Sequence, residues 1–385
     1  MYKVILKQGK EFKVLSRVWV YANEVEKIEG KDKQGSIAEV VSHDGRLIGY
    51  GFINHLSKII VRFLSKREEI FDEKFFYDLI YKSISKRKFD RFSGARLVFG
   101  ESDGLPGLIV DKYGEYLSVQ FLTLGMDLMK DFVVKTLAEI LSPKGIYERS
   151  DVAVREKEGL PLKKGLLYGE VPDEVTFIEN GLTMAISVKE GQKTGYFLDQ
   201  AKNRANFASY AKDKTVLDCF SNVGGFAVNA AKGGAKEVTA LDVSGLAVES
   251  ILRNAELNGL KVNAIKADVF EELRAYKKEG KKFDLICLDP PAFTKSADTV
   301  EKGYNGYRDV NILALKLLNE NGVLFTCSCS QHLTIELFLK MLKESAIAAR
   351  ADVSLLELSI QNADHACKIT EDEALYLKVA VLRRN

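Results

Sequence analysis

The feature that most constrains this fold is a regular alternation of strand-like and helix-like segments from Thr215 to the end of the chain. This region contains seven apolar strand-like segments, and amphipathic segments separate most of them. The strand-like segments lie at 215–220, 237–243, 263–270, 283–289, 323–329, 354–360 and 375–382. This alternation predicts a doubly wound α/β domain with a seven-stranded sheet. Because crossover connections share one hand, we expect the carboxyl ends of all the strands on one rim, where chemistry should be found.

The residues before this region divide into two further units. Residues 1–68 contain short strand-like runs broken by Gly35 and Gly45, a pattern that predicts a small β-barrel. Residues 69–188 begin with a segment of helical apolar spacing at 73–87 and continue with strand-like runs, as in an α+β domain. We therefore expect three domains, at 1–68, 69–188 and 189–385.

Positive charge is concentrated near the start of the chain. The first 100 residues hold 20 Lys and Arg against 13 Asp and Glu, whereas the whole chain has a net charge of only +2. Such a bias suits binding to nucleic-acid phosphates, but a solvated helix face gives the same composition, so both interpretations stay open. The densest basic run consists of Lys82, Lys86, Arg87, Lys88, Arg91 and Arg96.

Neither a membrane span nor a disulfide framework is indicated. No apolar run approaches the roughly 18 to 20 residues needed to cross a bilayer, and lysines interrupt the first segment, so we expect a cytosolic protein. The five cysteines form no CxxC pair and stand in apolar surroundings, which favours free thiols in a reducing compartment. No metal site is predicted.

A glycine-containing turn follows the first strand of the alternating region. Asp218 stands on that strand, and the turn contains Phe220, Ser221, Asn222 and Gly224. Small residues let a ligand lie against backbone amides at the start of the next helix. The nicotinamide fingerprint GxGxxG is absent, and Asp218 would repel a pyrophosphate but attract a cationic amino-acid group. The turn therefore favours S-adenosylmethionine over NAD, although any strand-to-helix turn can need glycine.

Two more acids end the next two strands. Asp242, followed by Val243 and Ser244, is suited to accept hydrogen bonds from both ribose hydroxyls. Asp268, followed by Val269, is suited to accept one from the adenine amino group. Each acid is also a typical helix N-cap. Three acids on one rim together favour the cofactor interpretation, and all of these residues are candidates to bind it.

The fourth strand ends in Asp289, Pro290, Pro291, Ala292 and Phe293. Two adjacent prolines fix an extended loop that presents the aspartate side chain and backbone carbonyls. We expect Asp289 and Pro290 to border the cofactor, and Pro291 and Phe293 to hold a planar base that carries an amino group. The alternative is a loop that simply terminates the strand.

The fifth strand ends in two alternating cysteines, Cys327 and Cys329. Alternation places both on one face of the strand, with Cys329 nearer the rim. A buried small side chain, a metal ligand and a nucleophile are the competing interpretations, and a metal pair is disfavoured because no other ligands cluster nearby. We interpret Cys327 as a core residue and Cys329 as a nucleophile.

A thiol nucleophile has a specific use on such a rim. Carbon 5 of a pyrimidine takes a methyl group only after a thiolate adds to carbon 6 and makes carbon 5 enamine-like. Asp289 would hold the N3 and amino edge of a cytosine and steady the charge that addition creates. The residue that removes the carbon 5 proton is not identified by the sequence.

These residues and several further motifs resemble the bacterial 23S rRNA cytosine-C5 methyltransferases, which combine a PUA domain, a middle α+β domain and a class I, Rossmann-like methyltransferase domain. The resemblance covers nearly the whole chain. It rests on DCFSNVGGF and LDPPAF together with GESDGLPGLIVD (100–111), GIYERSD (145–151), GQKTGYFLDQAKNR (191–204) and TCSCSQH (326–332).

The resemblance implies roles that spacing alone does not give. It makes S-adenosylmethionine the cofactor, with S-adenosylhomocysteine as product, Cys329 the nucleophile and the N-terminal domain an RNA-binding module. It adds cofactor-pocket candidates at Tyr196, Asp199, Gln200 and Arg204, although this segment also reads as an ordinary turn and helix start. The family usually reads Asp-His-Pro where this chain has Asp364, His365 and Ala366, so that loop is given no role.

The sequence thus predicts an RNA cytosine-C5 methyltransferase that acts on large-subunit ribosomal RNA. An exocyclic-amine methyltransferase stays open, because the Asp-Pro-Pro loop also suits direct attack by a base nitrogen. An RNA-binding or ribosome-assembly factor with a relic cofactor pocket is the alternative from another class. A homodimer is kept as a candidate assembly, and no membrane partner is expected.

Overall fold

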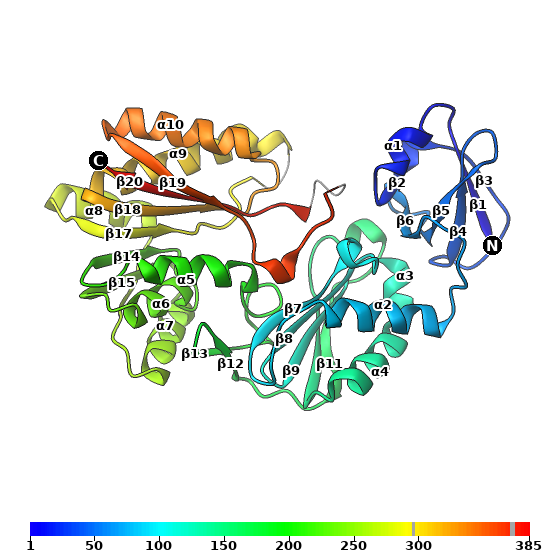
Figure 1. Ribbon diagram of the computed structural model, residues 1–385, viewed down its shortest axis with the longest axis horizontal. Coiled ribbons are helices and arrows are strands. Elements are labelled where there is room, and N and C mark those ends of the chain that lie inside the picture. Colours follow the sequence, from blue (N-terminus) through cyan, green and yellow to red (C-terminus); the bar gives the residue numbers. More distant parts are fainter. Residues whose placement is uncertain (295–296, 370–373) are drawn as a thin grey trace. The chain divides into compact units, whose positions relative to one another are not determined.

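The computed structural model describes residues 1–294, 297–369 and 374–385 and divides into two compact units, drawn in Figure 1. The first unit comprises residues 1–177, 186–198 and 364–374, and the second comprises residues 178–185, 199–363 and 375–385. No described helix is long and apolar enough to span a membrane.

The N-terminal β domain, residues 2–65, is a six-stranded sheet in the order β2-β6-β5-β4-β1-β3. Its neighbouring strands are antiparallel except for the parallel pair β1 and β4. Alternate residues such as Val4, Leu6 and Val40 point into its apolar core. The elements are β1 (Tyr2–Leu6), α1 (Glu11–Leu15), β2 (Trp19–Tyr21), β3 (Val25–Glu29), β4 (Ile37–Val41), β5 (Leu47–Ile53) and β6 (Ile59–Ser65).

A second sheet of the first unit, the middle sheet, has five strands in the order β11-β10-β9-β8-β7. Helices α2 and α4 bury residues such as Ile80 and Leu137 in its core, and Asp72 caps α2 by accepting a hydrogen bond from the Phe75 amide at 2.9 Å. The elements are α2 (Glu73–Ser85), β7 (Gly94–Phe99), β8 (Leu108–Tyr113), β9 (Tyr116–Phe121), α3 (Leu124–Leu128), α4 (Lys130–Leu141), β10 (Gly145–Ser150) and β11 (Lys163–Gly169).

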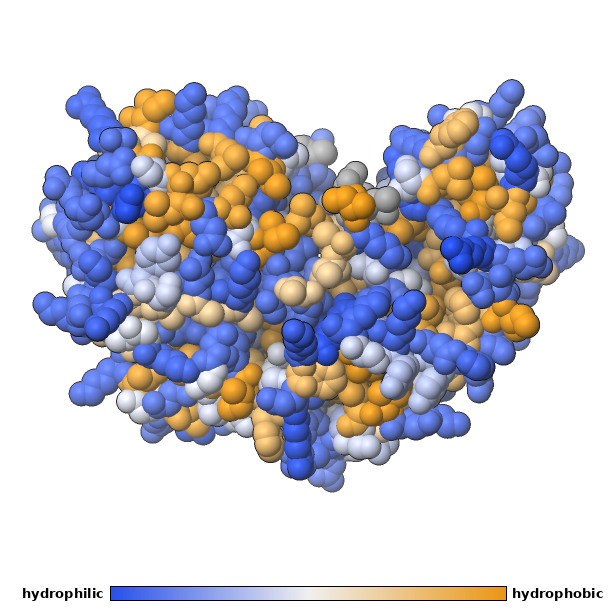
Figure 2. Space-filling view, viewed as in Figure 1, coloured by the Kyte–Doolittle hydropathy of each residue, from blue (hydrophilic) through white to orange (hydrophobic). Residues whose placement is uncertain are grey.

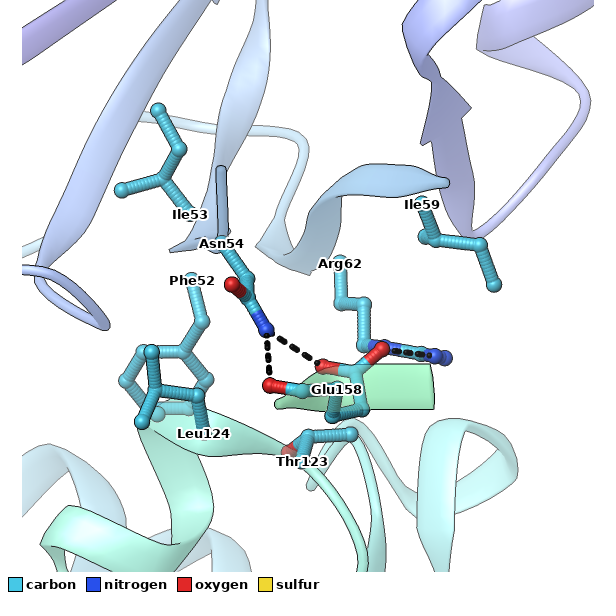
Figure 3. Close-up of a pocket in the computed structure, with 9 residues that line it drawn as sticks. Phe52, Ile53, Asn54, Ile59, Arg62, Thr123, Leu124 and Glu158 are labelled. Carbon is cyan, nitrogen blue, oxygen red and sulfur yellow. Dashed lines mark hydrogen bonds and ion pairs between the residues drawn. The ribbon is translucent and has the colours of Figure 1, made fainter. Parts of the chain in front are cut away.

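The N-terminal β domain and the middle sheet share one core and a buried polar junction. Phe52 of β5 stacks on Phe76 of α2 with ring centroids 5.9 Å apart. Beside this pair, Arg62 donates to the carboxylates of Glu101 and Glu158 at 2.8 and 2.9 Å. Figure 3 shows Arg62 and Asn54 converging on Glu158 from the β domain. The two sheets are therefore joined by both apolar and ionic contacts.

The second unit is built on a seven-stranded sheet in the order β16-β15-β14-β17-β18-β20-β19, which confirms the predicted doubly wound domain. Consecutive residues of its central strands alternate between two cores, as Ile286 and Cys287 do. The strands are β14 (Thr215–Cys219), β15 (Glu237–Asp242), β16 (Asn263–Lys266), β17 (Phe283–Leu288), β18 (Leu318–Ser328), β19 (Val353–Ser359) and β20 (Lys378–Arg384).

Helices cover both faces of this sheet (Figure 1). Those on one face contribute residues such as Tyr276 and Phe338 to one core, and those on the other contribute Phe207 and Ile251 to the second. The first group is α8 (Val269–Glu279), α9 (Val300–Leu317) and α10 (Ile335–Ala349), and the second is α5 (Ala201–Ser209), α6 (Gly225–Lys232) and α7 (Gly245–Leu257).

The expectation that every strand ends on the same rim was wrong for β20. Strand β20 pairs antiparallel with both β18 and β19, so its carboxyl end lies at the opposite edge. A parallel neighbour usually needs a helical crossover, and the described residues between β19 and β20 contain no α-helix. The chain therefore turns back, and β20 brings its first residue, Lys378, to the rim where β18 ends.

A short hairpin, β12 (Val175–Glu179) and β13 (Leu182–Ile186), has its tip in the second unit. Side-chain amides in α7 and directly after it pair with backbone groups of β13. The Asn254 side chain accepts from the Ala185 amide at 2.6 Å, and the Asn258 side chain accepts from the Thr183 amide at 2.8 Å. Asn254 also donates to the Val223 carbonyl at 2.9 Å, so it connects the hairpin to the turn after β14.

Candidate active site

The turn between β14 and α6 has an unusual backbone. Phe220 and Asn222 adopt left-handed conformations with φ of 62° and 53°, which non-glycine residues rarely do. Gly224 has a φ of 85°, and a Cβ there would stand 3.3 Å from the backbone of Ile251. The turn therefore holds two non-glycine residues in a backbone conformation that costs free energy, as is common at ligand sites.

Asp218 is fully buried just before this turn. One carboxylate oxygen accepts from the Ser221 hydroxyl at 2.5 Å and from the Ala227 amide at 3.0 Å. The other has no hydrogen-bond partner within the described part of the chain. Burial, assisted by the charges of Asp289 and Asp242, raises the Asp218 pKa to about 7. An oxygen of this kind is suited to accept a donor from a cationic ligand.

The acids at the end of β15 and after β16 hold backbone groups. Asp242 accepts from the amides of Asn222 and Ser244, each at 2.9 Å. The first of these bonds ties the end of β15 to the glycine turn. Asp268 caps α8 by accepting from the Glu271 amide at 3.0 Å, which is the alternative that the sequence left open.

The candidates beside these acids differ in exposure. Val243 is 68% exposed at the rim. Ser244 caps α7 through the Ala247 amide at 3.4 Å, and Val269 is buried in the apolar core. Val243 is therefore the one of the three whose apolar surface is open to a ligand.

The loop after β17 is anchored to the same rim. The Asp289 amide donates to the Cys219 carbonyl at 3.4 Å, and the Gln200 side chain donates to the Asp289 carboxylate at 3.1 Å. Asn203 in turn donates to Gln200 at 2.7 Å. Pro290 is buried and Pro291 is exposed. Gln200 and Asp289, both predicted cofactor-site residues, are thus brought together.

Phe293 packs in a cluster of aromatic rings. Its centroid lies 6.3 Å from that of Phe220, 6.1 Å from that of Phe270 and 4.7 Å from that of Tyr307. The ring is only partly buried, so one part of it is supported by the protein and another part is accessible. A base could stack only on the accessible part.

The two cysteines of β18 have different surroundings. Cys327 is fully buried in the apolar core, as the sequence predicted, and burial raises its pKa. Cys329 comes directly after the strand and is partly exposed. Because β17 and β18 are parallel, with Leu288 opposite Thr326, Asp289 and Cys329 both follow strand ends on one rim.

A lysine that the sequence analysis missed stands next to Cys329. Lys378 of β20 lies opposite Ser328, and its ammonium group donates to the Ser330 carbonyl at 2.7 Å. Burial lowers the Lys378 pKa to about 8, while the Cys329 sulfur acts to raise it. A positively charged lysine in this position would favour the thiolate form of Cys329. The signal in the sequence is a lysine that interrupts the apolar run LYLKVAVL.

Tyr307 and Ser330 connect the cysteine turn to the Asp-Pro-Pro loop. The Tyr307 hydroxyl and the Ser330 hydroxyl share a hydrogen bond of 2.8 Å. The Ser330 hydroxyl accepts from the Thr294 amide at 3.3 Å, and the Tyr307 hydroxyl accepts from the Phe293 amide at 3.4 Å. These bonds fix the loop that carries Asp289 relative to the turn that carries Cys329.

The remaining candidates lie in the segment from Tyr196 to Arg204. Tyr196 belongs to the first unit, where its ring packs on Phe177 at 5.2 Å. In the second unit, Asp199 accepts from the Tyr376 hydroxyl at 2.5 Å. Arg204 is buried and donates twice to Glu179, at 2.7 Å each, so this guanidinium has a structural ion pair.

Comparison with known proteins points to one family. A model described as S-adenosylmethionine-dependent methyltransferase matches residues 163–364, and a PUA-like domain model matches residues 4–66. The chain is 40% identical to the ribosomal RNA large subunit methyltransferase I of Aeromonas salmonicida, over 99% of this chain and 98% of that protein. It is 39% identical to the protein of the same name from Klebsiella pneumoniae, over 98% and 96%.

A solved structure shares the fold of the entire chain. It is a protein from Streptococcus mutans described as a methyltransferase that depends on S-adenosylmethionine. It aligns with a TM-score of 0.85 over 100% of both chains at 23% identity. The predicted order of a PUA-like domain followed by a Rossmann-like methyltransferase domain is thereby confirmed.

Proposed function

Because this chain belongs to the family of S-adenosylmethionine-dependent methyltransferases, we propose that it methylates carbon 5 of a cytosine in large-subunit ribosomal RNA, with Cys329 as nucleophile. The RNA class comes from the curated relatives, which are named for it and match nearly the full chain. In this proposal residues 1–68 contact RNA, residues 69–188 form the middle domain and residues 189–385 carry the reaction.

The residues of the site fit the cofactor. Asp218 offers a buried carboxylate oxygen that has no partner in the described residues, and a cationic amino-acid group could donate a hydrogen bond to it. The glycine turn, Asp242 and the exposed Val243 border the same rim. When bound there, S-adenosylmethionine supplies an electrophilic methyl group, and S-adenosylhomocysteine is left as product.

One observation carries the choice of reaction. Asp289 and Cys329 follow the ends of two adjacent parallel strands, and the Lys378 ammonium group is bonded beside the cysteine. An enzyme that methylates an exocyclic amine needs the Asp-Pro-Pro loop but has no use for a thiol with a neighbouring cation. The pair of a carboxyl group and a thiol therefore favours covalent catalysis at carbon 5.

In the proposed reaction, Cys329 attacks the base and Asp289 holds it. The Cys329 thiolate forms a bond to carbon 6, and the displaced electron pair moves toward N3, which takes a proton from the Asp289 carboxyl group while the amino group donates to the same residue. Carbon 5 then becomes nucleophilic and accepts the methyl group, and the N3 proton returns to Asp289. After a base removes the carbon 5 proton, the bond between sulfur and carbon 6 breaks and its electron pair returns to Cys329 as thiolate.

The test compares two cysteines of one strand. Cys329→Ala is expected to lower methyl transfer to large-subunit ribosomal RNA by about a thousandfold or more, because the attacking atom is gone. Cys327→Ala is the matched control and should stay within a few-fold of the parent. Transfer is measured with a labelled methyl donor, and the product nucleoside is identified by digestion and mass spectrometry.

The alternatives predict other outcomes. If Cys329→Ala kept the parental rate and the product were cytosine methylated on its amino group, the protein would be an exocyclic-amine methyltransferase. Absence of S-adenosylmethionine binding in calorimetry would indicate an assembly factor with a relic pocket. Either result would overturn covalent catalysis by Cys329.

A further inference from the structure

We propose that residues 81–92, the last turn of α2 and the loop after it, form an RNA-contact surface separate from the N-terminal β domain. Phe92 would stack on a base, and Lys82, Lys86 and Lys88 would contact phosphates. This proposal depends on the proposed function, because it takes ribosomal RNA as the partner.

The structure sorts the basic run at 82–96 into structural and available charges. Arg87 is held by Asp103 through bonds of 2.8 and 2.6 Å. Arg96 is held by Asp111 through two bonds of 2.7 Å. Both pairs are largely buried. These two arginines stabilise the middle sheet and are not free to bind a ligand.

The lysines of the run are accessible. Lys82 and Lys88 are exposed and form no ion pair with any residue that the structure describes. The Lys86 side chain is 49% exposed and reaches Asp103 only at 3.4 Å. Three ammonium groups within seven residues, and a helical spacing of four between Lys82 and Lys86, give a local positive surface.

The loop presents an exposed aromatic ring on a fixed backbone. Phe92 is 55% exposed, with the Arg91 guanidinium 5.5 Å from its ring centroid. The buried Lys112 donates to the carbonyls of Asp90, Arg91 and Ser93 at 2.8, 2.8 and 3.2 Å. Burial lowers the Lys112 pKa to about 8, which shows that keeping this ammonium group charged inside the protein is costly.

The backbone is held from the other side as well. The Asp90 carboxylate accepts from the amides of Phe92 and Ser93, both at 2.8 Å. These bonds lower the Asp90 pKa, so its charge persists at neutral pH but is directed at the loop's own amides. An exposed phenylalanine on a rigid loop resembles the stacking platforms that bind single-stranded nucleic acid.

The chemistry of the surface favours RNA over other partners. Tyr81, also 55% exposed, adds a second aromatic residue among the lysines. Hydrophilic side chains are seen over α2 among the apolar ones on the face in Figure 2, and such a mixed surface suits phosphates and bases better than a membrane. Interleaved cations and aromatic rings match phosphates and bases.

The test measures RNA binding by the full-length protein across salt concentrations. Large-subunit ribosomal RNA made in vitro is the probe, and filter binding gives the affinity. Lys82→Glu combined with Lys88→Glu is expected to weaken binding about tenfold or more and to reduce the salt slope by about 2. Phe92→Ala is expected to weaken binding at least about fivefold without changing the slope.

Controls separate this surface from general charge effects. Lys277→Glu combined with Lys278→Glu, on the exposed end of α8, changes the net charge equally and should leave affinity within about twofold. Calorimetry with S-adenosylmethionine should give equal affinity for every variant, which shows that folding is intact. Unchanged RNA affinity in the α2 variants, or an equal loss in the α8 pair, would overturn the proposal.

The outcome is distinct from that of the Cys329 test. Binding does not require the thiol, so a protein that methylates RNA normally yet binds it independently of residues 81–92 would refute only this surface. A parent protein that neither binds nor methylates the RNA would refute the proposed function and this inference together.

Discussion

At the scale of single residues, Asp218 lies in an environment that disfavours its charge. It is fully buried, two other acids lie close enough to act on it, and one of its oxygens has no partner in the described chain. Its pKa of about 7 in the folded protein lies well above the usual value of 3.8. The folded state therefore holds the proton more tightly than the unfolded chain does.

This shift gives a prediction with a definite sign. The stability contributed by protonated Asp218 is present below about pH 4 and is lost as pH rises through about 7. Asp218→Asn, neutral throughout, should stabilise the protein at pH 8 by up to about 4 kcal/mol, and the gain should vanish toward pH 4. Thermal unfolding at both pH values measures it, and S-adenosylmethionine binding should weaken.

Asp284 provides the control. Burial acts to raise its pKa, but hydrogen bonds from Thr215 and Asn319 outweigh burial and lower it. Its contribution therefore has the opposite sign, and Asp284→Asn should destabilise the protein at pH 8. Equal destabilisation by both variants at both pH values would contradict this interpretation of Asp218.

Some residues of the site could be identified from the sequence and others could not. Asp218, Asp289 and Cys329 stand at strand ends, and parallel strands in an alternating chain bring such residues to one rim. Lys378 was missed because its place depends on an antiparallel register with Ser328, 50 positions earlier in the chain. Local pattern does not encode that register.

At the scale of elements, α9 differs from its sequence pattern in both of its bounds. The apolar spacing of residues 310–322 predicts a helix there, whereas α9 spans Val300–Leu317 and residues 318–322 belong to β18. Gly303 and Gly306 lower helix propensity in its first half, which hid the start of the helix. Gly303 lies against the Asp-Pro-Pro loop, where a Cβ would stand 2.2 Å from the Thr294 side chain and 2.9 Å from the Phe293 backbone.

This contact predicts a difference between two glycines of one helix. Gly303→Ala should displace the loop that carries Asp289 and lower turnover about 10- to 100-fold, since small misplacements at a site are costly. Gly306→Ala should keep near-parental turnover, because its Cβ would meet only the Phe293 ring at 3.3 Å. Steady-state methyl transfer and thermal unfolding measure both variants. Equal turnover of the two would show that α9 does not position the loop.

At the scale of the whole molecule, the chain exchanges segments between its units in ways that no local pattern indicates. Residues 178–185 belong to the second unit and residues 364–374 to the first. The loop at Asp364, to which we assigned no role, is structural, because its carboxylate accepts from the Arg96 amide at 2.9 Å and from His365 at 2.8 Å. The boundaries near 68 and 188 remain predictions.

The polar junction inside the first unit holds the N-terminal β domain on the middle sheet. Arg62 is 8% exposed and Glu158 is 2% exposed, and Ser57 and Asn54 also bond to Glu158, at 2.7 and 3.1 Å. Trp19 donates to Glu101 at 2.9 Å from the same domain. If Arg62 is removed, the buried Glu158 and the partly buried Glu101 lose their cation, and that loss should cost about 3 to 5 kcal/mol.

Arg62→Met should therefore loosen the β domain before the middle sheet unfolds. We expect faster hydrogen exchange in β5 and β6 and new protease cleavage between residues 66 and 72, while β8 and β9 stay protected. Adding Glu158→Gln to Arg62→Met should recover part of the stability, because one uncompensated charge is removed. Uniform loss of protection across both sheets would instead mean that the β domain and the middle sheet unfold as one cooperative body, with the junction serving only as part of their common core.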